Sequence, residues 1–100
     1  MRIIAKSRLL NYWEKSGNEQ SKSHLNEWYH FCQEQEWRTP QDIKNTLSHA
    51  SIVKNNRVVF NVNGNHYRIV CSIFYPAQIM YIKFVGTHTE YDQINVNTIE

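Results

Sequence analysis

Long apolar runs are missing from this sequence of 100 residues. No stretch approaches the roughly 20 apolar residues that a helix needs to span a bilayer. The N-terminus carries Arg2, Lys6 and Arg8 where a signal peptide would need an unbroken apolar segment. These absences argue against a membrane protein or an exported one, and they predict a soluble protein of the cytoplasm.

Cysteine is almost as scarce. The 2 cysteines, Cys32 and Cys71, lie far apart and match no CxxC or Cys/His metal spacing. The 5 histidines are scattered, and none belongs to an HExxH motif. The sequence therefore gives no reason to expect a disulfide framework, a metal or another cofactor, and both thiols are predicted to be small core residues.

Acidic residues are absent from the middle of the chain. No Asp or Glu occurs between residues 43 and 89, a stretch that holds Lys44, Lys54, Arg57, Arg68 and Lys83. A basic surface of this kind fits a partner that carries phosphates, such as a nucleic acid. A plainer interpretation fits equally well, because many sheets place lysines along exposed strand edges to prevent aggregation.

The residues that are present are sufficient for a folded core. Hydrophobic residues make up 41% of the chain and aromatic residues 13%, which is too rich for disorder. No repeat, low-complexity tract or linker divides the sequence. We therefore expect a single domain over residues 1–100.

The first half of the chain shows the periodicity of amphipathic helices, with apolar residues at steps of three and four. The expected elements are a strand over residues 1–5 and helices over residues 7–16, 21–36 and 40–47. We predict Ser7 as the N-cap of the first helix and Thr39 as the N-cap of the third. Pro40 should end the second helix, because the residue before a proline is disfavoured in helical geometry.

From about residue 49 the apolar residues alternate with polar ones, which is typical of strands. Asn63-Gly64 lies between two such runs and predicts a hairpin with a two-residue turn. A second hairpin is expected at Pro76-Ala77, and residues 87–90 have the spacing of a helical capping box. The order predicts an α+β fold (β-α-α-β-β-β plus a short C-terminal helix or tail), with the N-terminal helices on one face of an antiparallel-dominated sheet.

Side-chain alternation divides this sheet into two faces. The two-residue turn would place Asn61 opposite His66, and an even second loop would place Val70 opposite Lys83. The face expected to pack on the helices contains Val58, Phe60, Val62, Tyr67, Ile69, Cys71, Ile73, Met80, Ile82 and Phe84. The other face contains Arg57, Asn61, His66, Arg68, Ser72, Tyr81 and Lys83, mixed with Val59, Val70 and Val85. That second face could grip a phosphodiester, or it could be a solvent face that happens to lack acids.

Two runs resemble motifs of HigB-type toxins, a branch of the RelE/ParE toxin superfamily. The first is the hairpin FNVNGNHYRIV over residues 60–70, and the second is YIKFVGTHTEYD over residues 81–92, with its distinctive Thr-His-x-Glu-Tyr-Asp ending. The spacing of the two runs, the chain length and the helix-then-sheet order also match. The resemblance implies a RelE-like fold and an mRNA interferase of a type II toxin–antitoxin module.

The resemblance also implies partners. Toxins of this family typically cleave mRNA engaged on the ribosome, and a helix-turn-helix (HigA-like) antitoxin silences them. The toxin–antitoxin complex represses its own promoter. We therefore expect mRNA, the ribosome, an antitoxin and, through the antitoxin complex, operator DNA as partners, and no membrane.

Four residues are the catalytic candidates. The motif matches carry over Arg68, His88 and Tyr91, and they align Lys83 with a position that is basic in the family. Metal-free RNA cleavage needs a base for the 2′-hydroxyl, a cation for the phosphorane charge and an acid for the leaving oxygen. Histidine titrates nearest neutral pH, so His88 could serve as base or acid while Arg68 clamps the phosphate. Tyr91 could stack on a base or donate a proton, and Lys83 could neutralise an adjacent phosphate as a point charge.

Four further residues, Lys54, Arg57, Asn61 and His66, are candidates for RNA binding. Each candidate also has an ordinary structural explanation, such as an exposed arginine, a helix-capping histidine or a tyrosine that packs the tail. Two other functions stay open: a ParE-like gyrase poison, and a nucleic-acid-binding module without catalysis. The combination of Arg68 with His88 favours cleavage.

Overall fold

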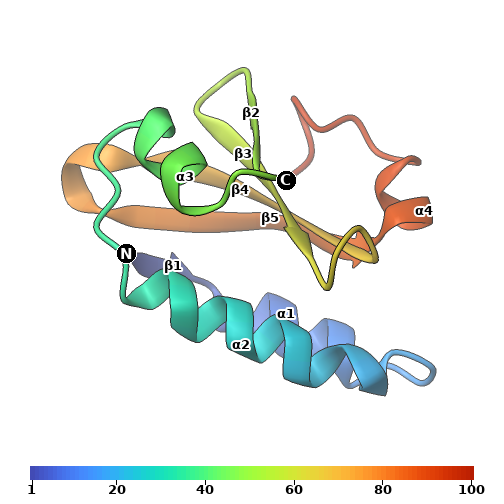
Figure 1. Cartoon of the computed structure of the whole chain (residues 1–100). Coiled ribbons are helices and arrows are strands. Elements are labelled where there is room, and N and C mark those ends of the chain that lie inside the picture. Colours follow the sequence, from blue (N-terminus) through green and yellow to red (C-terminus); the bar gives the residue numbers. More distant parts are fainter.

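The computed structural model describes residues 1–100 and has the α+β architecture that the sequence predicted (Figure 1). Its elements in chain order are β1 (Arg2–Ile4), α1 (Lys6–Trp13), a 3-10 turn (Glu19–Ser21), α2 (Lys22–Gln33), α3 (Pro40–Thr46), β2 (Ser51–Val53), β3 (Arg57–Val62), β4 (Tyr67–Phe74), a second 3-10 turn (Tyr75–Ala77), β5 (Ile79–Thr87) and α4 (His88–Tyr91). The 5-stranded sheet has the order β1-β5-β4-β3-β2. Only the β1–β5 pair is parallel. None of the helices is both long enough and apolar enough to cross a membrane.

Helices α1 and α2 run side by side along one face of the sheet (Figure 1). Their apolar stripes, which include Leu9, Leu25 and Cys32 at 0% exposure, pack against the apolar face of β3, β4 and β5. Nine of the ten residues expected on that face are in the core: Val58, Phe60, Val62, Tyr67, Ile69, Cys71, Ile73, Met80 and Ile82. Both cysteines are free and buried, as predicted, and burial raises the pKa of each thiol.

The helix boundaries differ from the prediction at several points. Helix α1 begins at Lys6 after Ala5 without any side-chain cap, so the prediction of Ser7 as its N-cap is wrong. Helix α2 ends at Gln33, well before Pro40, so the proline does not end it. Trp37, which follows the helix, is in the core, where its ring stacks on Phe60 at 6.0 Å between centroids.

Helix α3 begins as the sequence indicated. Thr39 is its N-cap and forms a capping box with Asp42, and Pro40 occupies the first turn. These contacts satisfy backbone N–H groups that the first helical turn would otherwise leave without partners.

The β3–β4 hairpin has a longer loop than predicted. Asn63 and Gly64 adopt positive φ angles, as expected, but the loop covers residues 63–66 and Val62 pairs with Tyr67. Asn61 therefore pairs with Arg68, and the predicted pair of Asn61 with His66 is wrong. The register shift is even, so every side chain of β4 keeps its predicted face.

A β-bulge in β5 changes the second register. Val70 pairs with Phe84, whereas the prediction paired it with Lys83, because the extra residue disturbs the ladder between Val70 and Cys71. Beyond the bulge, Val85 turns toward the core and Phe84 turns away from it. The two expected positions, Phe84 in the core and Val85 on the polar face, are therefore wrong.

One strand was not predicted. β2 is only 3 residues long and pairs with the first half of β3. Its burial pattern is exposed, exposed, half-buried, so it lacks the apolar alternation that reveals a strand in sequence.

Candidate active site

Three predicted site residues lie together at one end of the polar face of the sheet. Arg68 on β4 pairs with Gly86 on β5, two residues before the start of α4. Its guanidinium Nη2 lies 3.4 Å from Nδ1 of His88, and its Cζ lies 5.8 Å from the ring centroid of Tyr91. Arg68 therefore lies within reach of both His88 and Tyr91.

Helix α4 carries two of these three residues and starts as the sequence predicted. Thr87 is the N-cap, and Thr87 and Glu90 form the expected capping box. The backbone N–H of His88 donates to the carbonyl of His66 at 3.0 Å. This bond ties the first residue of α4 to the β3–β4 loop, so two segments that are distant in sequence fix the position of His88.

Arg68 is half-buried, and the hairpin loop that precedes β4 also holds its guanidinium. Its Nη1 donates to the carbonyl of Asn65 at 2.9 Å. Gly86 lies opposite, and a Cβ there would stand 2.6 Å from Cζ of Phe84 and 3.1 Å from Cβ of Glu90. A side chain at this position would therefore displace the Phe84 ring and crowd Glu90 of α4.

His66 lies in the hairpin loop, exposed, with its ring 4.6 Å from that of Tyr67. It lines a pocket of about 580 Å³ whose other lining residues are Asn63, Asn65, Thr87, His88 and Thr89. All of them are polar or small. The loop thus brings a second imidazole to the same pocket as His88, although its predicted partner Asn61 is elsewhere. On the far side of His88, Nε2 lies 3.7 Å from the carboxylate of Asp92.

Lys83 shares the polar face but makes no contact with Arg68 or His88. It is the residue at the bulge, and its Nζ lies 5.8 Å above the ring of Tyr81. Its carbonyl accepts a hydrogen bond from Arg8 at 2.9 Å. Lys83 lines a second pocket of about 370 Å³, together with Arg8 and Lys15 of α1. Glu100 also lines this pocket, so its three basic side chains lie beside a carboxylate, away from the pocket that His88 lines.

Arg57 is not available on the polar face, which is a correction to the sequence prediction. It is only 7% exposed, and its Nη1 donates to the carbonyls of Val96 and Ile99 at 3.1 and 2.5 Å. The C-terminal segment after α4 folds back over this part of the sheet, as Figure 1 shows. Val59 and Val70, expected on an open face, are buried at 3% and 0% exposure.

The other two RNA-binding candidates also lie away from His88. Asn61 donates its side-chain amide to the carbonyl of His49 at 3.0 Å, which ties β3 to the loop before β2. Lys54 is exposed in the turn between β2 and β3 and makes no hydrogen bond through its side chain. Asn61 is the cross-strand partner of Arg68, but its side-chain amide is bonded to His49 instead.

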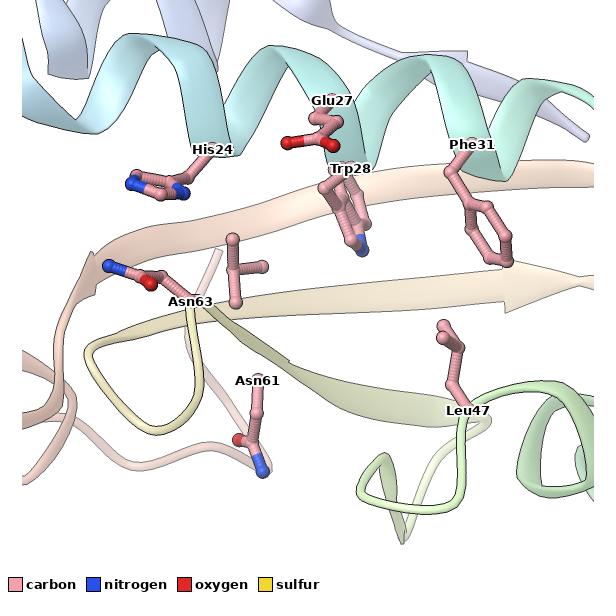
Figure 2. Close-up of a pocket in the computed structure, with 8 residues that line it drawn as sticks. His24, Glu27, Trp28, Phe31, Leu47, Asn61 and Asn63 are labelled. Carbon is pink, nitrogen blue, oxygen red and sulfur yellow. The ribbon is translucent and has the colours of Figure 1, made fainter.

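A separate groove of about 360 Å³ lies between α2 and the end of β3 (Figure 2). Trp28 and Phe31 of α2 face Leu47 across it, with Asn61 and Asn63 along the strand side. The Nε1 of Trp28 is buried without a hydrogen-bond partner. Asn63 lines both this groove and the His88 pocket, so the two adjoin.

Sequence reasoning missed Tyr12 as part of the site. Its hydroxyl donates to Oε1 of Glu90 at 2.9 Å, across 78 positions of sequence. Glu90 was visible as the third residue of the capping box, but nothing local to Tyr12 marks it as the partner. No three His, Cys, Asp or Glu side chains lie together as a group that could hold a metal ion.

Comparison with known families defines the class of the protein. Residues 21–94 match the family model described as HigB_toxin, RelE-like toxic component of a toxin-antitoxin system. The chain belongs to this family, and the resemblance found in its two sequence motifs is confirmed.

Three relatives match a shorter part of the chain. The chain is 53% identical over 34 residues to the mRNA interferase toxin HigB of Escherichia coli K12. The aligned residues make up 34% of this chain and 33% of that protein. The mRNA interferases HigB of Escherichia coli O157:H7 and Shigella flexneri match to the same extent. The matched part spans about a third of the length of these relatives.

Proposed function

We propose that residues 1–100 form a single toxin domain that acts as an mRNA interferase, a metal-independent endoribonuclease that cuts mRNA engaged on the ribosome. The observation that carries this proposal is the 3.4 Å approach of Arg68 Nη2 to His88 Nδ1 on an accessible part of the sheet. The relatives that match the chain are named mRNA interferases, which supports the same activity.

The reaction that fits these groups is attack by the 2′-oxygen on the neighbouring phosphorus. The P–O bond to the 2′-oxygen forms and the bond to the 5′-oxygen breaks. The products are a 2′,3′-cyclic phosphate and a 5′-hydroxyl, with the 2′ proton lost to a base and a proton supplied to the leaving oxygen. Negative charge builds on the phosphorane, and Arg68 would hold it with charge-assisted hydrogen bonds.

His88 is the proposed base or acid because of the partners of its two ring nitrogens. An arginine can only donate, so the nitrogen that faces Arg68, Nδ1, would carry the lone pair. Nε2 would then bear the proton, toward the Asp92 carboxylate 3.7 Å away. In this tautomer Nδ1 would accept the 2′ proton once a bound phosphate draws the Arg68 guanidinium away from it.

Tyr91 and His66 would serve the substrate on either side of that phosphate. Tyr91 presents its ring beside Arg68 and could stack on a base or donate a proton. His66 could contact the next nucleotide in the polar pocket or act as a second acid–base group. Lys83 would neutralise a phosphate further along the strand, and Lys54 and Asn61 would at most contact RNA at the periphery. Arg57 has no part in the proposed surface while the C-terminal segment covers it.

The family description implies an antitoxin partner. We propose that this antitoxin has a helix-turn-helix fold of the HigA type and that the complex binds operator DNA. A toxin that acts on ribosome-bound mRNA would work in the cytoplasm.

The decisive experiment is induction of the wild type and of His88→Ala in growing cells. Primer extension on mRNA should reveal cuts with the wild type, and the cleavage rate should fall by about 10²- to 10⁴-fold in the variant, the range for loss of a general acid or base. His30→Ala, which removes an exposed histidine of α2, is the matched control. Intact mRNA with DNA damage would indicate a gyrase poison, and RNA binding without cuts would indicate a non-catalytic module.

A further inference from the structure

The helix that carries His88 is too short to hold itself in place. α4 has 4 residues, fewer than an isolated helix needs to be stable in water. The His88 side chain is 57% exposed, so core packing does not fix it. Its orientation toward Arg68 must therefore depend on the contacts that anchor α4 to the rest of the molecule.

One anchor comes from the opposite layer of the fold. Tyr12, on α1, is 6% exposed, and its hydroxyl donates to Oε1 of Glu90 at 2.9 Å. The same oxygen accepts the backbone N–H of Thr87 at 2.7 Å. The absence of a side chain at Gly86 makes room for this carboxylate, since a Cβ there would lie 3.1 Å from Oε1.

The ring of Tyr12 supports a second anchor. It meets the ring of Tyr67 edge-on at 6.4 Å between centroids, and Tyr67 in turn packs against His66 at 4.6 Å. The carbonyl of His66 accepts the backbone N–H of His88 at 3.0 Å. Tyr12 therefore contacts two groups that help to hold His88 in place: Glu90 through its hydroxyl and Tyr67 through its ring.

From these contacts we propose that Tyr12 is a positioning residue that fixes α4, and with it His88, through its hydroxyl bond to Glu90. The importance of this bond for cleavage rests on the proposed function, whereas its effect on the order of α4 does not.

The protonation states of the pair suit this role. Burial raises the pKa of Tyr12, and the bond to Glu90 raises it further, so the hydroxyl stays a neutral donor. Partial burial raises the pKa of Glu90, but hydrogen bonds from Thr87 and Tyr12 outweigh it, and the pKa is lowered overall. A neutral donor and an ionised acceptor give a charge-assisted hydrogen bond, which is stronger than a neutral one.

The test is Tyr12→Phe, which removes the hydroxyl and keeps the ring against Tyr67. At a temperature where both proteins are folded by circular dichroism, we expect kcat for an RNA oligonucleotide to fall about 10-fold with KM unchanged, because loss of alignment lowers kcat steeply. Amide hydrogen exchange of residues 88–92 without RNA should become faster, while exchange in β4 stays as in the wild type. Tyr29→Phe, at a half-buried tyrosine of α2, is the matched control.

Two substitutions at the acceptor complete the test. Glu90→Gln keeps an oxygen for both donors and should stay within about 3-fold of wild-type kcat, whereas Glu90→Ala should reproduce the loss seen with Tyr12→Phe. Glu90→Ala also decides the question if Tyr12→Phe does not fold, since Glu90 is on the surface. Unchanged exchange at residues 88–92 in the folded variants would overturn the proposal. If the wild type cuts no RNA, the proposed function fails, and exchange alone still decides whether Tyr12 positions α4.

Discussion

Arg57 and Arg68 occupy the same face of two adjacent strands, yet their surroundings are opposite. Arg57 pairs across the ladder with Ser72, and Arg68 pairs with Asn61. The guanidinium of Arg68 stands beside His88 at the accessible end of the face. That of Arg57 is buried under the C-terminal segment and bonded to two of its carbonyls.

The difference shows what decides whether a basic residue can serve a ligand. Residue type and strand alternation place both arginines on the polar face, and that inference is correct for both. Availability depends on a third factor, the path of the chain after α4, where half-buried Ile94, Val96 and Ile99 alternate with exposed polar residues. The same fold therefore buries one arginine against two carbonyls of the C-terminal segment and leaves the other half-buried beside His88.

The largest expected effect comes from substitution of Arg68, the half-buried arginine beside His88. Arg68→Ala should lower the cleavage rate about 10²- to 10³-fold, the range for removal of one donor that stabilises charge in a transition state. The free energy of unfolding of this variant should change little, because the lost bond to the Asn65 carbonyl lies at an exposed loop. Single-turnover cleavage and thermal unfolding measure the two effects, and a variant that cleaves normally would remove Arg68 from the site.

Arg57→Ala should show the reverse pattern. It removes a charged donor from the carbonyls of Val96 and Ile99, so the free energy of unfolding should fall by about 1–3 kcal/mol. The cleavage rate of the folded variant should stay within about 3-fold of the wild type, since no part of the proposed reaction touches this residue. Denaturant unfolding measures the loss of stability, and the same cleavage assay measures the rate. A loss of cleavage as large as that of Arg68→Ala would mean that the covered end of the face also binds RNA.

Deleting residues 96–100 tests whether the C-terminal segment alone makes Arg57 less accessible than Arg68. The deletion should expose Arg57 and add one cation for RNA, so the dependence of binding on salt should steepen by about 0.7, the value for one phosphate contact on a single strand. Fluorescence anisotropy with a labelled oligonucleotide at several salt concentrations measures the slope. Glu100→Gln separates the loss of one acid from the loss of the cover. A slope equal to that of the wild type would show that uncovering Arg57 is not sufficient.

The pair of arginines also explains how much the sequence could predict. Alternation, the Asn63-Gly64 signal and the capping-box spacing act between near neighbours, so they predicted the fold, the faces of β3 and β4 and the start of α4. The loop length was wrong by an even number, which left Arg68 on its predicted side. The family resemblance singled out Arg68 and His88, and the pairing of β4 with β5 brings the two together.

The features that the sequence did not reveal depend on contacts between distant segments. The bulge at Lys83 exchanges the faces of Phe84 and Val85, and no local residue pattern announces it. The burial of Arg57 depends on residues about 40 positions later. Each of these outcomes is set by packing between segments, which competes with the local preferences from which strands and helices are predicted.

The smallest expected effect is that of low pH, which should loosen the Arg68 end of the polar face and leave the Arg57 end unchanged. Glu90 anchors α4 at the Arg68 end, and its pKa in the folded protein is lowered, because the bonds from Thr87 and Tyr12 outweigh the effect of partial burial. Its stabilising contribution is therefore complete above the ordinary value of 4.5 and is lost as the pH falls through the lowered folded value. The carbonyls that hold Arg57 do not titrate, so the covered end has no comparable dependence.

Hydrogen exchange between about pH 3 and pH 6, corrected for the intrinsic pH dependence of exchange, should therefore show α4 losing protection in the wild type as the solution becomes more acidic. The strand residues around Arg57 should keep their protection over the same interval. In Glu90→Gln the protection of α4 should be independent of pH, because a neutral amide occupies the anchor throughout. If the substitution leaves the acid-induced opening of α4 unchanged, the Tyr12–Glu90 anchor is not its cause.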